Sequence, residues 1–157
     1  FGIAASSLVG KSLGANDLEG AEEYIRESRK IGSIISSTVA VIFFFFGSHI
    51  VSLYTKNPEI IREASTVLKI IAFVQPFQSS QLIISGGLRG AGDTVWTLVA
   101  TFVGVMIIRV LLAYLFVRVL GMGLIGAWIA TFVDQFTRWI VIYLRFRTNK
   151  WKFITIR

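Results

Sequence analysis

The most restrictive feature of this sequence is a run of 24 residues, from Ile31 to Tyr54, that contains no Lys, Arg, Asp or Glu. As a helix rising 1.5 Å per residue, the run would be about 36 Å long, which exceeds a hydrocarbon core of about 30 Å. Three more apolar runs follow, at residues 64–88, 94–117 and 124–144, and only the last contains an acidic residue. These runs predict an all-α membrane protein with four full transmembrane helices.

Two flanking segments complete the expected organisation. Residues 1–14 are apolar apart from Lys11 but are too short to span a bilayer, so they predict the end of a fifth helix that begins upstream of Phe1. No basic segment precedes them, which argues against a signal peptide and indicates a fragment of a longer chain. Residues 145–157 are predicted to form a basic tail.

The composition excludes several classes of function. Charged residues make up 16% of the 157 residues, whereas soluble domains contain about 25%. The chain has no Cys and one His, His49, which excludes a disulfide framework, an iron–sulfur cluster and a histidine-rich metal centre. It also lacks a Ser/His/Asp or Cys/His set for covalent catalysis. The sequence therefore predicts a protein that is not an enzyme and binds neither a metal cofactor nor an organic one.

The formal charge of +7 follows the predicted topology. Ten Lys and Arg residues lie in 11–30, 87–93 and 145–157, whereas three lie in the alternate connections, in 55–62 and at Arg118. The positive-inside rule places the richer side, and with it the C-terminus, in the cytoplasm. Because basic residues at helix ends contact lipid headgroups, the charge does not indicate a nucleic-acid partner.

The connections contain signals for helix starts. Asn16 with Glu19 three residues later is typical of a capping box. Residues 17–30 are acidic at first and basic at their end, which predicts a solvated helix that runs into the first span. Asn57 followed by Pro58 predicts another helix start, with Asn as the cap and Pro in the first helical position.

The segment after the second apolar run is rich in glycine. Gly86, Gly87, Gly90 and Gly92 are expected to break the chain there, and Asp93 is placed to cap the third span. We expect a tight cytoplasmic turn. A hinge at Gly90 and Gly92 is the alternative, because glycine has no Cβ to restrict its backbone.

The second apolar run has a polar centre, formed by Gln75, Gln78, Ser79 and Gln81 around Pro76. Pro76 lacks a backbone N–H and is expected to kink the helix and to free a carbonyl group. Polar groups at membrane depth face protein or a water-filled cavity. The pattern favours the lining of a substrate or ion cavity, with hydrogen bonding between helices as the alternative.

Three charged residues lie inside the last two runs. Arg109 is near the middle of the third, where an arginine costs about 2.5–3.5 kcal/mol on insertion. It either extends to an interface or points into the bundle and meets a carboxylate, and with the second run it is expected to contribute to the wall of the substrate or ion cavity. Asp134 and Arg138 are four residues apart on the fourth and are predicted to form an intramembrane charge pair, with titration of Asp134 as the alternative. Gly126 and Ala130 continue their row and permit close helix contact.

Several segments resemble those of multidrug and toxic compound extrusion (MATE) transporters. Leu88-Arg89-Gly90-Ala91-Gly92-Asp93-Thr94 matches the family's "LRGAGDT", and residues 8–16 are similar to "LVGQxLGA". Residues 52–59 are similar to its "LFTxDPE" connection. The later positions that resemble the family are Ile108-Arg109, Asp134 to Arg138, Arg145-Phe146 and Trp151-Lys152.

The resemblance implies a transporter with twelve helices in two six-helix lobes related by pseudo-symmetry, of which this chain would be the end of helix eight through helix twelve. It implies a multi-pass protein of the plasma membrane that exports small organic, cationic compounds bound between the lobes. Flow of H⁺ or Na⁺ would drive export, and the missing N-terminal lobe would be the partner. Since residues 64–88 contain no Asp or Glu, the coupling carboxylate would be Asp134 or lie in that lobe.

Two other functions stay open from the sequence. One is a flippase for lipid-linked precursors from the same superfamily, whose cavity would need several cationic residues to hold pyrophosphate. Arg109 alone gives that function little support. The other is a membrane interaction module without transport activity, because half a lobe encloses no pathway.

Overall fold

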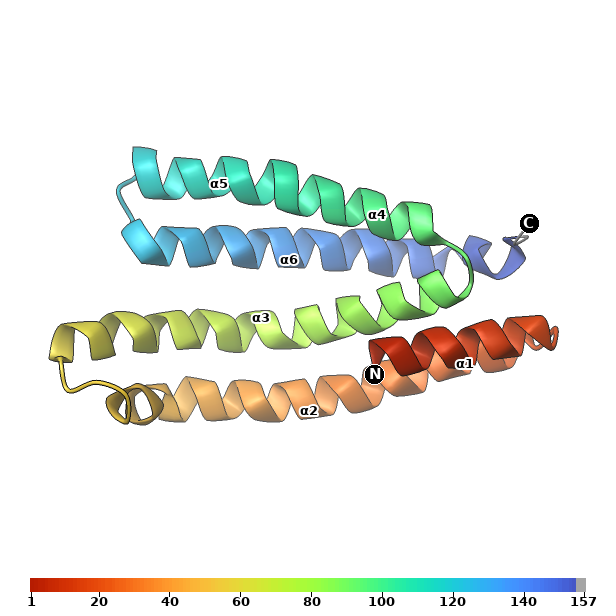
Figure 1. Cartoon of the computed structure of the whole chain (residues 1–157), viewed down its shortest axis with the longest axis horizontal. Coiled ribbons are helices and arrows are strands. Elements are labelled where there is room, and N and C mark those ends of the chain that lie inside the picture. Colours follow the sequence, from red (N-terminus) through yellow and green to blue (C-terminus); the bar gives the residue numbers. More distant parts are fainter. Residues whose placement is uncertain (155–157) are drawn as a thin grey trace.

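The computed structural model describes residues 1–154 as helices joined by short connections (Figure 1). Residues 155–157 of the predicted tail, Arg157 among them, lie outside the described residues. The helices are α1 (Gly2–Gly14), α2 (Leu18–Ser52), α3 (Pro58–Gly90), α4 (Thr94–Phe102), η1 (Val103–Arg109), α5 (Val110–Tyr114), η2 (Leu115–Val119), α6 (Gly123–Arg147) and η3 (Lys150–Phe153).

The third predicted span is one continuous helix, Thr94–Val119, here called the α4–η2 helix. Two of its parts, η1 and η2, are π-helical, with seven and five residues. The predicted helical span is confirmed, but the sequence did not predict its π-helical segments. π-Helical segments are rare and frequently occur at functional sites.

The long helices run antiparallel, and α3 is at the centre of the arrangement. It contacts α1, α2, α4 and α6, whereas α6 also packs along the α4–η2 helix. Connections 15–17 and 91–93 lie at the same end of the molecule as η3, and connections 53–57 and 120–122 lie at the other end (Figure 1). This confirms the alternation of ends on which the predicted topology rests.

The fully buried core lies at the end that carries η3. Its residues come from α1, α2, α3, α4 and α6, together with Ala91 of the connection before α4 and Trp151 of η3. The Trp151 indole is completely buried, stacks on Phe146 and donates a hydrogen bond of 3.0 Å to the Phe146 carbonyl. Lys152 forms an ion pair with Glu22 of α2, so the C-terminal segment is attached to both α6 and α2.

Of the two predicted helix starts, one differs in detail and the other is confirmed. Asp17, and not Asn16, caps α2: its carboxylate accepts a hydrogen bond of 2.9 Å from the Gly20 backbone, while Asn16 adopts a left-handed conformation in the turn. Asn57 caps α3 as predicted and accepts a hydrogen bond of 3.0 Å from the backbone N–H of Glu59. As expected, α2 continues unbroken from its solvated start into the first span.

Gly86 and Gly90, near the end of α3, pack against α1, Gly87 faces Ile25 of α2, and none of the three breaks the helix. Gly86, Gly87 and Gly90 all lie within α3. A Cβ on Gly86 would collide with the Gly2 backbone, and one on Gly90 would collide with Ser6, one turn further along α1. The sequence-based prediction of a chain break at these residues was therefore wrong. Small residues four apart let the two backbones approach closely.

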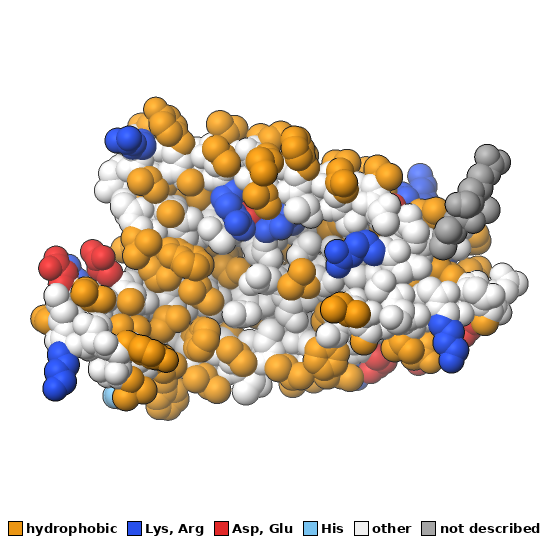
Figure 2. All heavy atoms as spheres, viewed as in Figure 1, with side chains coloured by type: hydrophobic (Ala, Val, Ile, Leu, Met, Phe, Trp, Pro, Cys, Tyr) orange, Lys and Arg blue, Asp and Glu red, His pale blue; other side chains and the backbone are white. Residues whose placement is uncertain are grey.

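Three helices are long and apolar enough to cross a membrane, by length and composition, among residues 1–154: α2, α3 and the α4–η2 helix. The fourth predicted span forms α6, whose 25 residues give about 37 Å, but Asp134, Gln135 and Arg138 make it less apolar. Large hydrophobic side chains such as Phe45 and Leu111 are well exposed, and hydrophobic groups cover much of the face in Figure 2. This surface is that of a helical membrane protein.

Candidate functional site

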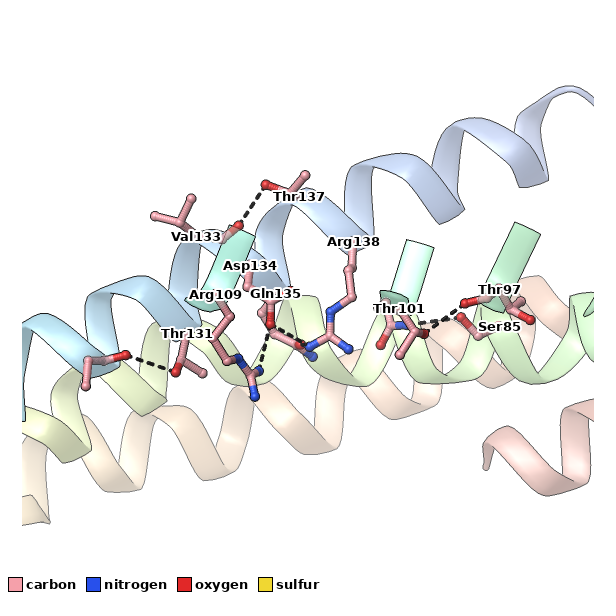
Figure 3. Close-up of polar contacts among 12 residues, drawn as sticks. Ser85, Thr97, Thr101, Arg109, Thr131, Val133, Asp134, Gln135, Thr137 and Arg138 are labelled. Atoms are coloured by element: carbon pink, nitrogen blue, oxygen red, sulfur yellow. Dashed lines mark hydrogen bonds and ion pairs between the residues drawn. The ribbon is translucent and has the colours of Figure 1, made fainter. Parts of the chain in front are cut away.

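A cluster of three charged residues joins the α4–η2 helix to α6. Asp134 Oδ2 forms an ion pair with a terminal nitrogen of Arg109 at 2.7 Å and accepts a hydrogen bond of 2.9 Å from a terminal nitrogen of Arg138. Figure 3 shows the two arginines approaching this carboxylate from different helices. The sequence left open whether Arg109 extends to an interface or meets a carboxylate, and the structure shows that it meets Asp134. The predicted pair of Asp134 and Arg138 is formed, with Arg109 as a third member.

The backbone of the third span makes room for the carboxylate. Gly104 is buried in η1, and a Cβ there would collide with Asp134 Oδ1 and would lie 2.5 Å from Arg138 Cγ. The Asp134 side chain is fully buried, whereas those of Arg109 and Arg138 are 36% and 12% exposed. The carboxylate thus lies behind the two guanidinium groups, against the other helix.

The cluster carries more positive than negative charge. One carboxylate, that of Asp134, faces the guanidinium groups of Arg109 and Arg138. Arg138 also donates to the amide oxygen of Gln135. Three buried polar atoms of the cluster have no hydrogen-bond partner among residues 1–154: Arg109 Nε, Asp134 Oδ1 and Arg138 Nε. Such groups are costly in an apolar interior unless a partner reaches them.

A cavity of about 490 Å³ adjoins the cluster between α3, the α4–η2 helix and α6. Both arginines line it, but Asp134 does not. In Figure 2, basic side chains around an acidic one are visible midway along the molecule. The other lining residues are Gln78, Gln81, Thr131 and Gln135, which are polar, Trp128, and Ile71, Val74 and Leu82, which are aliphatic.

The structure divides the predicted cavity residues between two sites. Gln78 and Gln81 line the cavity with Arg109, and Gln81 is buried and donates to Ser85 Oγ at 3.1 Å. Gln75 and Ser79 line a different cavity of about 460 Å³, between α1, α2 and α3, which Gln78 also reaches. The residues that the sequence assigned to one cavity thus lie in two. A role in binding stays a prediction for each of these residues.

The turn residues have structural partners. Asp93 is the N-cap residue of α4, as predicted, but its side chain does not bond to the helix backbone. Its carboxylate accepts a hydrogen bond from Arg145 Nε at 2.7 Å instead. The Arg145 guanidinium also lies over the Trp96 ring. Gly92 has φ of 83°, as a tight turn requires. Pro76 lies inside the unbroken helix α3, and a hinge role for it, Gly90 or Gly92 stays a prediction.

Sequence reasoning missed two polar contacts and one glycine. Trp139 Nε1 donates to Ser80 Oγ at 3.0 Å and joins α6 to α3, and Arg145 pairs with Asp93. Neither contact leaves a local signal, because the partners are far apart in the sequence. Gly104 could have been found, since a lone glycine within an apolar span near Arg109 is typical of a close approach to another helix.

Comparison with known proteins gives consistent results. The MatE family model matches residues 1–115. The "Uncharacterized transporter YisQ" of Bacillus subtilis (strain 168) is 32% identical over 155 residues, which cover 96% of this chain and 34% of that protein. The "Probable multidrug resistance protein NorM" of Thermotoga maritima is 31% identical over 154 residues, which cover 97% of this chain and 33% of that protein. The chain spans about a third of the length of these relatives.

A solved structure has the same fold. It is described as the inward-facing conformation of a multidrug resistance MATE family transporter of the MOP superfamily. The TM-score is 0.85 at 22% sequence identity, and the match covers 92% of this chain and 32% of that one. The arrangement of helices described above is therefore that of part of a larger helical membrane protein.

Proposed function

Because this chain belongs to the MatE family of transporters, we propose that it is the C-terminal third of a membrane exporter of small organic compounds. The observation that carries the proposal is the match to proteins named for multidrug resistance over nearly the whole chain. The names of these relatives favour drug efflux over the flipping of lipid-linked precursors. The family consists of transporters, so no enzymatic activity is proposed.

The charged cluster supports a transport role. Ionisable residues inside apolar helices are costly and commonly mark substrate or ion pathways. Here the cluster adjoins a cavity with polar and apolar walls, which suits the binding of a small organic compound.

The proposed mechanism is alternating access. This part and an N-terminal lobe would rock around a substrate site near the middle of the bilayer, and binding of H⁺ or Na⁺ would favour one of the two states. Export would be an antiport, with Asp134 or a carboxylate of the other lobe as the coupling group. The protein would lie in the plasma membrane with its C-terminus in the cytoplasm. We also propose that the exported compounds are cationic.

The test uses the full-length transporter in a bacterial strain that lacks its major efflux pumps. Ethidium efflux is followed by fluorescence in cells, and then in proteoliposomes with an imposed H⁺ or Na⁺ gradient. We expect gradient-driven efflux that Asp134→Asn reduces more than Gln81→Ala does, since Asp134 holds two arginines. Absence of efflux by the wild-type protein, at normal expression, would contradict the proposal. Unchanged efflux in both variants would remove both residues from the mechanism.

A further inference from the structure

We propose that the cavity between α3, the α4–η2 helix and α6 binds the anionic group of an organic compound between Arg109 and Arg138. The ligand class is a compound with one carboxylate or sulfonate beside an apolar ring. The inference rests on the proposed function only for transport; binding at this cavity is a separate property. It adds acidic and zwitterionic compounds to the cationic ones expected as substrates.

The first argument is the charge that a ligand would meet. Arg109 and Arg138 line the cavity, whereas the one carboxylate of the cluster is fully buried behind them against Gly104. Other acidic groups are remote or already paired: α3 has no Asp or Glu after Glu63, and Asp93 is held by Arg145. The cavity wall therefore carries one positive charge in excess, which a single anionic group would neutralise.

The second argument is the unused hydrogen-bonding capacity of the arginines. Each guanidinium has five N–H donors, and the contacts with Asp134 use one terminal nitrogen of each arginine. Nε of both arginines is buried without a partner among residues 1–154. A carboxylate can accept two parallel hydrogen bonds from one arginine, and such charge-assisted bonds are about twice as strong as neutral ones. The amides of Gln78 and Gln81 on the facing helix supply further donors.

The third argument is the rest of the cavity wall. Ile71 and Val74 of α3 and Trp128 of α6 give one side of the cavity an apolar surface, and an indole can pack against an aromatic ring. The volume of about 490 Å³ is within the range of about 300–1,000 Å³ that is usual for small-molecule sites. In a compound with an apolar ring and one anionic group, the ring would pack on the apolar side of the cavity and the anionic group would contact the arginines.

Two probes that share a ring and differ in charge test the proposal. Radiolabelled 1-naphthylacetate carries a carboxylate, and 1-naphthylmethylamine carries an ammonium group. Equilibrium binding of each is measured on the full-length transporter in detergent. Arg109→Gln removes the excess charge but leaves Asp134 paired with Arg138, so it should fold. Arg109→Lys keeps the charge, and Arg118→Gln makes the same change on the same helix outside the cavity.

We expect the wild-type protein to bind 1-naphthylacetate more tightly than the amine. Arg109→Gln should weaken that binding about tenfold or more, in line with the loss of a charged hydrogen-bond donor. Arg109→Lys should retain most of the affinity, and Arg118→Gln should not change it. Equal binding of the acid by the wild-type protein and Arg109→Gln would overturn the proposal, and so would tighter binding of the amine in an Arg109-dependent manner.

Ethidium efflux by the same protein variants, reconstituted in proteoliposomes, separates this inference from the proposed function. Binding of the acid that depends on Arg109, without any efflux, would support the anion site and contradict the transport proposal. Efflux without Arg109-dependent binding of the acid would support the transport proposal and contradict the anion site.

Discussion

At the scale of single residues, Gly104 decides whether the charged cluster can form. It lies in the π-helical segment η1, and the carboxylate of Asp134 and the stem of Arg138 occupy the space that a side chain would need. A π-helical turn carries an extra residue and so changes which side chains face a neighbouring helix. In this helix Arg109 lies at the end of that segment and reaches Asp134.

Gly104→Ala should lower the stability of the full-length protein by about 1–3 kcal/mol, because an added methyl group in a closely packed site forces its neighbours apart. Thermal unfolding in detergent, followed by tryptophan fluorescence, would measure the loss. Gly14→Ala is the matched control, since a Cβ at Gly14 would meet nothing within 4 Å. An equal effect of the two substitutions would show that Gly104 has no packing role.

At the scale of elements, the ion pair between Glu22 of α2 and Lys152 of η3 makes stability depend on pH. A hydrogen bond and charge attraction from Lys152, together with those from Arg26, lower the pKa of Glu22 below its ordinary value of 4.5, although burial opposes the shift. Since the folded state has the lower pKa, the contribution is complete above pH 4.5 and is lost as the pH falls through the folded-state pKa.

Glu22→Gln should therefore reduce stability by about 1 kcal/mol at neutral pH and make the variant less sensitive to acid than the wild-type protein. Unfolding temperatures measured from pH 7 down to pH 3 would show the two curves converging at low pH. Glu19→Gln serves as control, because Glu19 forms no ion pair within the part of the chain that is described. Parallel curves for the wild-type protein and Glu22→Gln would contradict the assignment.

The existence and order of the helices could be predicted because a bilayer fixes the length of an apolar run. The predicted span 94–117 corresponds to Thr94–Val119, and 124–144 corresponds to Gly123–Arg147. The end of α3 could not be predicted from the sequence. Gly86 and Gly90 allow α1 to pack closely against α3, and this contact is visible only in the structure.

The candidate site could be predicted only where its geometry is local. Asp134 and Arg138 lie on one helix at a fixed spacing, so their pairing follows from the sequence. The approach of Arg109 depends on the register between two helices and on the π-helical segment η1, and neither has a reliable signal in one sequence. The sequence also could not show that Gln75 and Gln81 line different cavities, because this depends on which helices cover the two sides of α3.

At the scale of the whole molecule, the two ends differ in their number of basic residues. Within the described residues, the end that carries η3 contains basic residues from α1, α2, α3, α6 and η3, whereas the other end contains Lys56, Arg62 and Arg118. This asymmetry is the basis for placing the η3 end in the cytoplasm.

Single cysteines introduced into a cysteine-free form of the full-length protein would test that orientation. Lys56→Cys should react with a membrane-impermeant maleimide added to intact cells, and Lys150→Cys should react only after the cells are permeabilised. The two positions lie at opposite ends of the helices, which makes each the control for the other. Labelling of Lys150→Cys in intact cells would reverse the topology.

The link between Arg109 and Asp134 also has a consequence for biosynthesis. The ribosome delivers the Arg109 helix first, and this helix alone would place an unpaired arginine near the bilayer centre at a cost of about 2.5–3.5 kcal/mol. The carboxylate that offsets this cost arrives with the next helix, after a connection of only a few residues. The cost is therefore lowest when the translocon releases both helices together as a hairpin, so that the later segment stabilises the insertion of the earlier one.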